Sequence, residues 1–167
     1  MNERKDGHGM KAKNGFSLVE LMIVIGIMAV VVGFMSLGLW YVFAADTESL
    51  AQSINSGLTS LKSENTSKSA PTYMHFYLHN GDYYIAYTDS DTFADFGTVG
   101  KKIGGDNVSV SCDGTAIAED TDIVFGIRRK DGAFSSGPKL ITCSQGDDIY
   151  SVHIVQSTGK HFVKNDQ

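Results

Sequence analysis

Glu20 is the side chain of the N-terminal region that is best placed to do chemistry, because it stands directly before a long apolar run. From Leu21 to Ala45 there are 25 residues, and all except Ser36 are glycines or residues of the aliphatic and aromatic hydrophobic types. A carboxylate costs about 3 kcal/mol at the centre of a membrane-spanning helix and less near its end, and such residues usually have a functional partner. We therefore expect a partner for Glu20; the alternative is a carboxylate that simply lies among lipid headgroups.

Histidines and carboxylates in the rest of the chain are the candidates for metal binding. Four of the five histidines lie beyond the apolar run, and these are His75, His79, His153 and His161. His75 and His79 share one face of an expected strand but are too far apart to bind one ion jointly. Three acidic clusters could hold calcium: Asp89/Asp91, Glu119/Asp120/Asp122 and Asp147/Asp148. None has the EF-hand pattern, so we expect solvated turns, no metal ion and no cofactor.

Two cysteines, Cys112 and Cys143, fall at the ends of two expected strands. A disulfide between them would close a loop of about 30 residues and would stabilise the fold by roughly 3 kcal/mol if the strands are neighbours. Free buried thiols are the alternative.

Catalysis and nucleic-acid binding have little support in the sequence. There is no G-x-S-x-G motif and no P-loop pattern, so we expect neither an enzyme nor a nucleotide site. The basic runs are Lys101-Lys102 and Arg128-Arg129-Lys130. The first 15 residues carry a local charge of +2 within a total of −5, so the remainder carries −7. An acidic body argues against DNA as a partner.

The apolar run is long enough to cross a membrane as a helix, since 25 residues extend over roughly 38 Å. We expect a transmembrane segment over about residues 18–45, with the basic N-terminus in the cytoplasm and the remainder exported. A cleaved signal peptide is disfavoured because the run is too long and Phe43 stands where a small residue is required. A plain signal anchor remains the alternative.

After the apolar run the pattern stays helical and then becomes alternating. Leu50, Ile54, Leu58 and Leu61 lie on one helical face, which predicts an amphipathic second half of one long helix over residues 16–64. The run Ser63–Pro71 reads as an exit loop. Residues 65–167 are expected to form one β-rich domain.

The expected strands begin with a hairpin, Thr72–His79 and Asp82–Thr88, around the type I′ turn signal Asn80-Gly81. Further strands are expected at Val108–Cys112, Asp122–Arg128, Lys139–Ser144, Ile149–Gln156 and Lys160–Val163. Asp89–Gly105 is expected to be irregular. One helix followed only by strands predicts an α+β fold with an antiparallel sheet packed on the helix.

The N-terminal segment GFSLVELMIVIGIMAVV resembles the N-terminus of type IV pilins and pseudopilins. The family motif is a basic leader, a glycine, a phenylalanine, three residues, a glutamate and an apolar helix. Lys13, Gly15, Phe16 and Glu20 match it in order.

This resemblance implies that a prepilin peptidase removes the leader, residues 1–15, by cutting between Gly15 and Phe16. The same enzyme commonly N-methylates the new terminal phenylalanine. A glycine leaves the backbone unhindered at a cut site, because it has no Cβ. The resemblance further implies that Glu20 neutralises the amine of a neighbouring subunit, since unpaired charge is costly in low dielectric.

The C-terminal half resembles the heads of H-type minor pseudopilins and related FimT-like minor pilins. The segments that carry this resemblance are Phe125, Asp131-Gly132, Ile141, Val152-His153-Ile154 and Thr158-Gly159-Lys160. The resemblance implies a pilin-like fold.

Together these features predict a structural minor pilin or pseudopilin of a type IV pilus or a type II secretion pseudopilus. Its expected partners are a prepilin peptidase, other pilins through the N-terminal helix, and membrane lipid before assembly. The alternative is a membrane-anchored binding module for DNA uptake or adhesion. We expect a single-pass cytoplasmic membrane protein that later joins a cell-surface or periplasmic filament.

Overall fold

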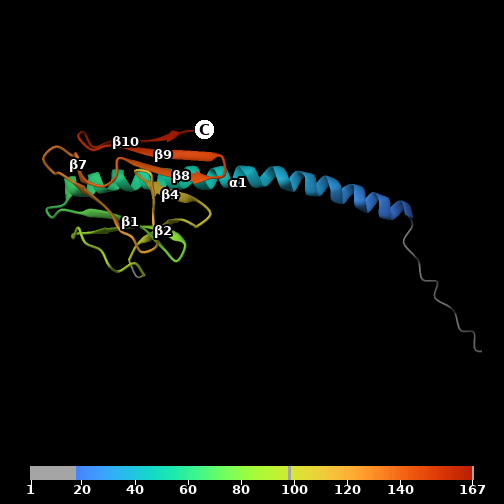
Figure 1. The fold of residues 1–167 in the computed structure, drawn as a ribbon, viewed down its shortest axis with the longest axis horizontal. Helices are drawn as coiled ribbons and strands as arrows, with labels where there is room; N and C mark the ends of the chain where they lie inside the picture. Colours follow the sequence, from blue (N-terminus) through green and yellow to red (C-terminus); the bar gives the residue numbers. More distant parts are fainter. Residues whose placement is uncertain (1–17, 98, 167) are drawn as a thin grey trace, which may run out of the picture. The chain divides into compact units, whose positions relative to one another are not determined.

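The structure is a computed structural model that describes residues 18–97 and 99–166. Gly15 and Phe16 lie outside the described residues, as do the side chains of residues 30–45. The chain divides into two units, Met1–Leu39 and Trp40–Gln167. The second unit contains all the described strands and is called the head below (Figure 1).

The described helix, α1 (Leu18–Ser67), contributes residues to both units. Within the head, the predicted apolar stripe is confirmed: Leu50, Ile54, Leu58 and Leu61 are at most 1% exposed. Ala51 widens this buried face. A stripe of this width is typical of a helix that packs against a core.

The end of α1 lies three residues beyond the predicted end at residue 64. Two hydroxyl groups explain the extension, because Thr66 donates to the Lys62 carbonyl at 2.8 Å and Ser67 to the Ser63 carbonyl at 2.9 Å. These side chains satisfy backbone carbonyls in the last turns, where helical partners run out. The expected exit loop from Ser63 is therefore wrong in its first five residues.

The strands form two antiparallel sheets rather than the single sheet that was expected. The first has the order β3-β2-β1-β6-β7 and consists of β1 (Tyr73–His79), β2 (Asp82–Thr88), β3 (Lys101–Gly104), β6 (Ile123–Ile127) and β7 (Phe134–Ser136). The second has the order β10-β9-β8-β4-β5 and consists of β4 (Ser109–Cys112), β5 (Thr115–Ala116), β8 (Leu140–Gln145), β9 (Asp148–Val155) and β10 (Lys160–Asn165). The predicted α+β class with antiparallel pairing is confirmed.

The hairpin at Asn80-Gly81 is also confirmed. Both residues have positive φ, 51° and 77°, as a type I′ turn requires. The pairing of β1 with β2 runs in register from Tyr73↔Thr88 to His79↔Asp82. The two-residue turn thus joins strands that pair along their full length.

Three short strands were missed. β3 lies within Asp89–Gly105, which was expected to be irregular, and β5 and β7 have only two and three residues. β3 begins with two exposed lysines, Lys101 and Lys102, so it has no apolar alternation that a sequence pattern could detect. It is a strand because it pairs with β2 at the sheet edge.

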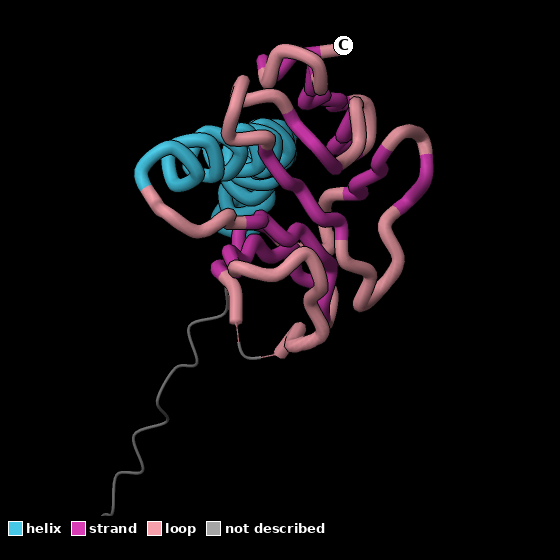
Figure 2. Tube along the Cα trace, turned by 90° about the vertical axis from the view of Figure 1, so that its left-hand side faces the viewer, coloured by secondary structure: helices cyan, strands magenta, loops and turns pink. Residues whose placement is uncertain are grey.

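The core lies between α1 and the two sheets. Strands β8 to β10 lie on one side of α1 and β1 and β2 on the other, and a view along the helix shows strands above and below it (Figures 1 and 2). Leu58 of α1, Phe76 of β1 and Ile141 of β8 are all fully buried members of one cluster. The buried stripe on α1 thus belongs to the same core cluster as residues of both sheets.

Close packing of α1 on β2 depends on Gly57. A Cβ at this position would stand 2.9 Å from the Ile85 side chain and 3.0 Å from the Met74 sulfur. The Tyr87 hydroxyl also donates to the Gly57 carbonyl at 3.0 Å. Glycine lowers helix propensity by about 1 kcal/mol, but here it gives the sheet room to approach.

Candidate functional site

The N-terminal part of α1 presents apolar side chains on all sides, with Glu20 among them in the first turn. The exposed apolar residues are Leu18, Val19, Leu21, Met22, Ile23, Val24, Ile25, Ile27 and Met28, and they are 46–73% exposed. Because these occupy nine of eleven consecutive positions, they surround the helix. A helix that is apolar all round requires lipid or other helices as its surroundings.

Among the described residues, no helix combines the length and apolar character that a membrane crossing demands. The transmembrane segment expected over about residues 18–45 extends through residues 30–45, whose side chains lie outside the description.

The outward face of the first sheet is covered by residues 89–97. The Phe93 ring packs against Tyr77 at a tilt of 38° with ring centroids 5.2 Å apart, and Phe96 meets the same ring edge-on at 5.2 Å. Tyr77 is fully buried and its hydroxyl donates to the Val99 carbonyl. Burial raises the pKa of Tyr77, and the Tyr84 hydroxyl adds to the effect. This cover explains why β1 has aromatic residues on both faces.

His75 lies beneath this covering segment and is fully buried. Its Nδ1 donates to Asp122 Oδ2 at 2.8 Å, and its ring stacks on Phe93 at 4.9 Å. Its Nε2 lies 2.8 Å from the Thr88 hydroxyl and 3.0 Å from the Ser90 carbonyl. His75 therefore holds three segments together: β1, the covering segment and the residue before β6.

His79 lies next to Glu119 and Asp120, two members of the acidic cluster Glu119/Asp120/Asp122. Its Nδ1 lies 2.6 Å from Asp120 Oδ1, and Glu119 accepts a hydrogen bond from the Asn80 backbone amide. The third member, Asp122, contacts His75 instead. The expected cluster is thus divided between two histidines, and those contacts cross 41 and 47 residues of sequence. No spacing signal in the sequence indicates this.

Cys112 and Cys143 lie on neighbouring strands, β4 and β8, and both thiols are free. In the register Val110 pairs with Cys143 and Cys112 with Ile141, so the two cysteines are offset by two residues rather than opposed. Burial raises the pKa of each thiol to about 12. The candidate disulfide is absent from this structure because the strand register does not place the cysteines opposite each other.

Three residues of the two basic runs, Lys102, Arg128 and Arg129, have partners in the head. Lys102 pairs with Asp82 at 2.6 Å, and Arg128 with Asp131 at 3.2 Å. Arg129 donates to backbone carbonyls at the end of α1, a role that sequence analysis missed. Each of these cations is thus engaged in contacts within the chain.

A groove of about 820 Å³ lies between α1 and strands β2 and β3. The helix contributes mainly hydroxyl and amide side chains, from Glu48, Ser49, Gln52, Ser53, Ser56 and Ser60. The strands contribute Ile85, Tyr87, Lys101, Lys102 and Ile103. The groove is open and mixed in polarity, with Glu48 on one wall and two lysines on the other.

Comparison with known proteins places one family signature on the chain. Residues 10–36 match the family described as the prokaryotic N-terminal methylation motif. The matched stretch includes Gly15, Phe16 and Glu20. A search of curated proteins and a search of solved structures each found no match.

This match supports a type IV pilin or pseudopilin. The motif implies processing by a prepilin peptidase, N-methylation and assembly with other pilins. Proteins with this motif are structural rather than enzymatic, and it implies a membrane-anchored protein that later enters a surface or periplasmic filament.

Proposed function

We propose that this chain is a structural minor subunit of a type IV pilus or of a type II secretion pseudopilus. The observation that carries the proposal is the match of residues 10–36 to the N-terminal methylation motif. The order Gly15, Phe16, Glu20 and apolar helix supplies the cut site, the new terminus and the charged residue that such a subunit needs.

Maturation begins with a cut between Gly15 and Phe16. The prepilin peptidase removes the basic leader, residues 1–15, and methylates the amine of Phe16. Before assembly the chain crosses the cytoplasmic membrane once, over about residues 18–45, with the head exported. The leader's positive charge is consistent with a cytoplasmic N-terminus.

Assembly exchanges lipid for sister helices around the apolar part of α1. The exposed apolar residues on all sides of the helix support this step, because each can be buried by a neighbouring helix. Glu20 pairs with the amine of a neighbouring subunit's Phe16. An unpaired carboxylate would be costly in that apolar setting, so the pair fixes the stagger between subunits.

The head is displayed on the filament and resembles those of H-type minor subunits. The two turn sequences in which this resemblance lies, Asp131-Gly132 and Thr158-Gly159-Lys160, have glycines with positive φ, 69° at Gly132 and 67° at Gly159. Phe125 and Ile141 are buried strand residues in the core.

The direct test of the proposal is the mass of the chain from cells that contain a prepilin peptidase. The expected product begins at Phe16 and carries one methyl group. A Gly15→Leu variant, with a bulky residue at the cut, should retain its leader. An intact Met1 in the wild-type chain would count against the proposal.

A Glu20→Ala variant separates a filament subunit from a membrane-anchored binding module. The variant should still be cut after Gly15 but should be depleted from sheared filaments, with Glu48→Ala as the control in the head. Normal incorporation of Glu20→Ala would remove the proposed role of Glu20 in stagger. Absence of the wild-type chain from filaments would favour the binding module.

A further inference from the structure

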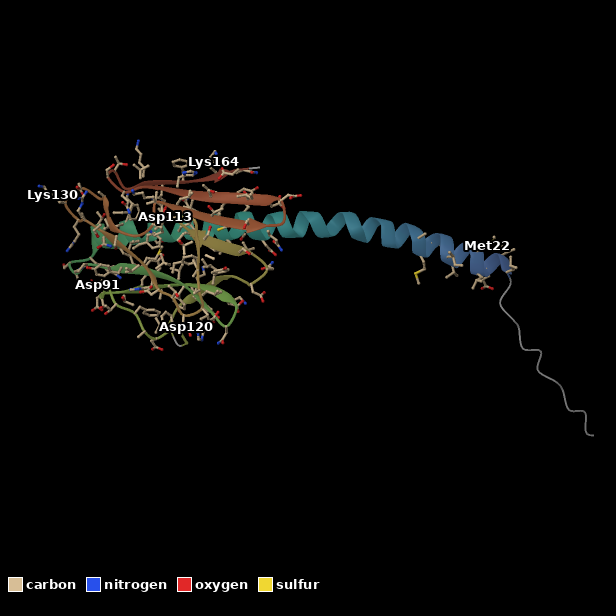
Figure 3. All side chains as sticks on the ribbon, in the orientation of Figure 1. Met22, Asp91, Asp113, Asp120, Lys130 and Lys164 are labelled. Carbon is tan, nitrogen blue, oxygen red and sulfur yellow. The ribbon has the colours of Figure 1, made fainter. Side chains whose placement is uncertain are left out.

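His79, Glu119 and Asp120 present three metal-ligating groups whose donor atoms all lie within 4.8 Å of one another. His79 is the last residue of β1, whereas the two carboxylates come from the segment between β5 and β6. Asp120 lies at the rim of the head, on the opposite side from Lys164 (Figure 3). The group differs from an acidic cluster because its imidazole supplies a nitrogen ligand.

The charge of the cluster favours a cation. Within the described part of the chain, no lysine or arginine forms an ion pair with Glu119 or Asp120. With a neutral His79, the three side chains therefore carry a charge of −2 from their two carboxylates. His79 is 24% exposed and Asp120 51% exposed, so an ion and its water ligands can reach the cluster.

The backbone holds the carboxylates in place without an ion. The Asp120 amide donates to the Leu78 carbonyl at 2.8 Å, and Leu78 and Glu119 form an isolated bridge. The Asn80 amide donates to the Glu119 carboxylate. Because both sides of the site are fixed to the end of β1, little conformational freedom remains to be lost on binding.

We infer that His79, Glu119 and Asp120 bind a divalent transition-metal ion of the zinc type. Imidazole nitrogen and carboxylate oxygen are both zinc ligands, and water completes the coordination of zinc sites that have three protein ligands. Calcium and magnesium instead favour sets of oxygen ligands. The ion would connect the β1–β2 hairpin to the segment before β6.

The hydrogen bonds around His79 predict a change of tautomer on binding. Nε2 lies 3.0 Å from the Asn80 side-chain Nδ2, which can only donate, so a neutral ring would carry its proton on Nδ1, facing Asp120. An ion bound at Nδ1 displaces that proton to Nε2. The Asn80 amide then turns to present its Oδ1, as outer partners of metal-bound histidines do.

The test is calorimetric titration of zinc chloride into the untagged full chain in detergent micelles. Every protein carries His8→Gln, so that the leader's histidine cannot contribute. We expect one zinc ion per chain, and binding weaker by about tenfold or more in His79→Gln. His153→Gln is the matched control, since this histidine stacks on Phe162 on another sheet, and it should bind as the parent does.

Four further measurements test the inference even if one variant is unstable. Nitrogen NMR shifts should show that His79 changes from the Nδ1–H to the Nε2–H tautomer as zinc is added. Glu119→Gln should also weaken binding, and the melting temperature of the parent, but not of His79→Gln, should rise with zinc. Calcium chloride should give no comparable heat.

No zinc binding by the parent, or equal affinity in His79→Gln, would overturn the inference. So would calcium binding as tight as zinc binding, because the imidazole would then have no role. The outcome is independent of processing at Gly15, so failure here leaves the proposed function standing.

Discussion

The Arg129 guanidinium donates a 3.2 Å hydrogen bond from Nε to the backbone carbonyl of Asn65, across 64 residues of sequence. Its other nitrogens donate to the carbonyls of Lys68 and Ser69. The end of α1 and the residues that follow it are thus satisfied by a side chain from the turn after β6. This residue belongs to the basic run Arg128-Arg129-Lys130, and its contacts stabilise the fold.

Replacement of Arg129 by alanine should destabilise the head by about 1–2 kcal/mol, because carbonyls at the end of α1 lose a charged donor. Arg129→Lys should lose most of this stability, since an ammonium cannot donate to three carbonyls in a planar fork. Lys130→Ala, next to it on the surface, should change stability by less than about 0.5 kcal/mol. Urea unfolding midpoints of the three variants provide the measurement. Equal losses of stability in Arg129→Ala and Lys130→Ala would mean that positive charge, and not the hydrogen bonds from Arg129 to the carbonyls, stabilises the end of α1.

Removal of the Asp122 carboxylate should loosen the segment that covers the first sheet. Asp122→Ala leaves the buried His75 Nδ1 without its acceptor, which costs about 1–3 kcal/mol. Asp91→Ala, an exposed carboxylate in the covering segment, is the control and should be nearly neutral. Hydrogen exchange should accelerate at residues 89–97 in Asp122→Ala only. Unchanged exchange there would show that His75 does not anchor the segment.

Stability should fall on acidification partly through His161. Burial lowers the pKa of His161 from 6.5, and the positive charge of Lys62 lowers it further. The hydrogen bond with the Gly159 carbonyl has the opposite effect on this pKa, smaller than that of burial. A folded-state pKa below the unfolded value means that the native state favours neutral imidazole. The contribution of neutral His161 to the stability of the head is therefore present above about pH 6.5. It is lost as the pH falls through the lower pKa of His161 in the folded state.

The His161→Gln variant should lack this contribution to the pH dependence of stability. At about pH 7.5 it should be less stable than the wild type by about 1 kcal/mol, because the 3.0 Å contact with the Thr59 hydroxyl is weakened. Between about pH 7.5 and 5.5 the difference should narrow. Urea unfolding at both pH values measures it; a difference that widens on acidification would contradict the lowered pKa.

Both cysteines should be present as slow-reacting thiols. Their pKa of about 12, against an ordinary 9.0, lowers the thiolate fraction about a thousandfold at neutral pH. A thiol reagent should label the folded chain slowly and should find two thiols after unfolding in urea without reductant. Zero thiols in the unfolded chain would reveal a disulfide, and rapid labelling of the folded chain would contradict the burial.

Features encoded by neighbouring residues could be predicted from the sequence. The order Gly15, Phe16 and Glu20 before an apolar run identifies the motif that the family comparison matches. The spacing of Leu50, Ile54, Leu58 and Leu61 predicts the buried face of α1, and Asn80-Gly81 predicts the first hairpin. Helical periodicity and turn conformation depend on contacts over a few residues, so the sequence expresses them directly.

Features that join distant residues were decided only by the tertiary structure. Strand β3 forms because it pairs with the edge of β2, and Arg129 donates to a carbonyl at the end of α1. Asp120 contacts His79, whereas Asp122 contacts His75. The offset of Cys112 and Cys143 follows from the register of β4 and β8. In each case the partner is at least 15 residues away in sequence, and its identity depends on how the two sheets pack around α1. Local spacing carries no record of that packing, because many chain paths are compatible with the same pattern of apolar and polar residues.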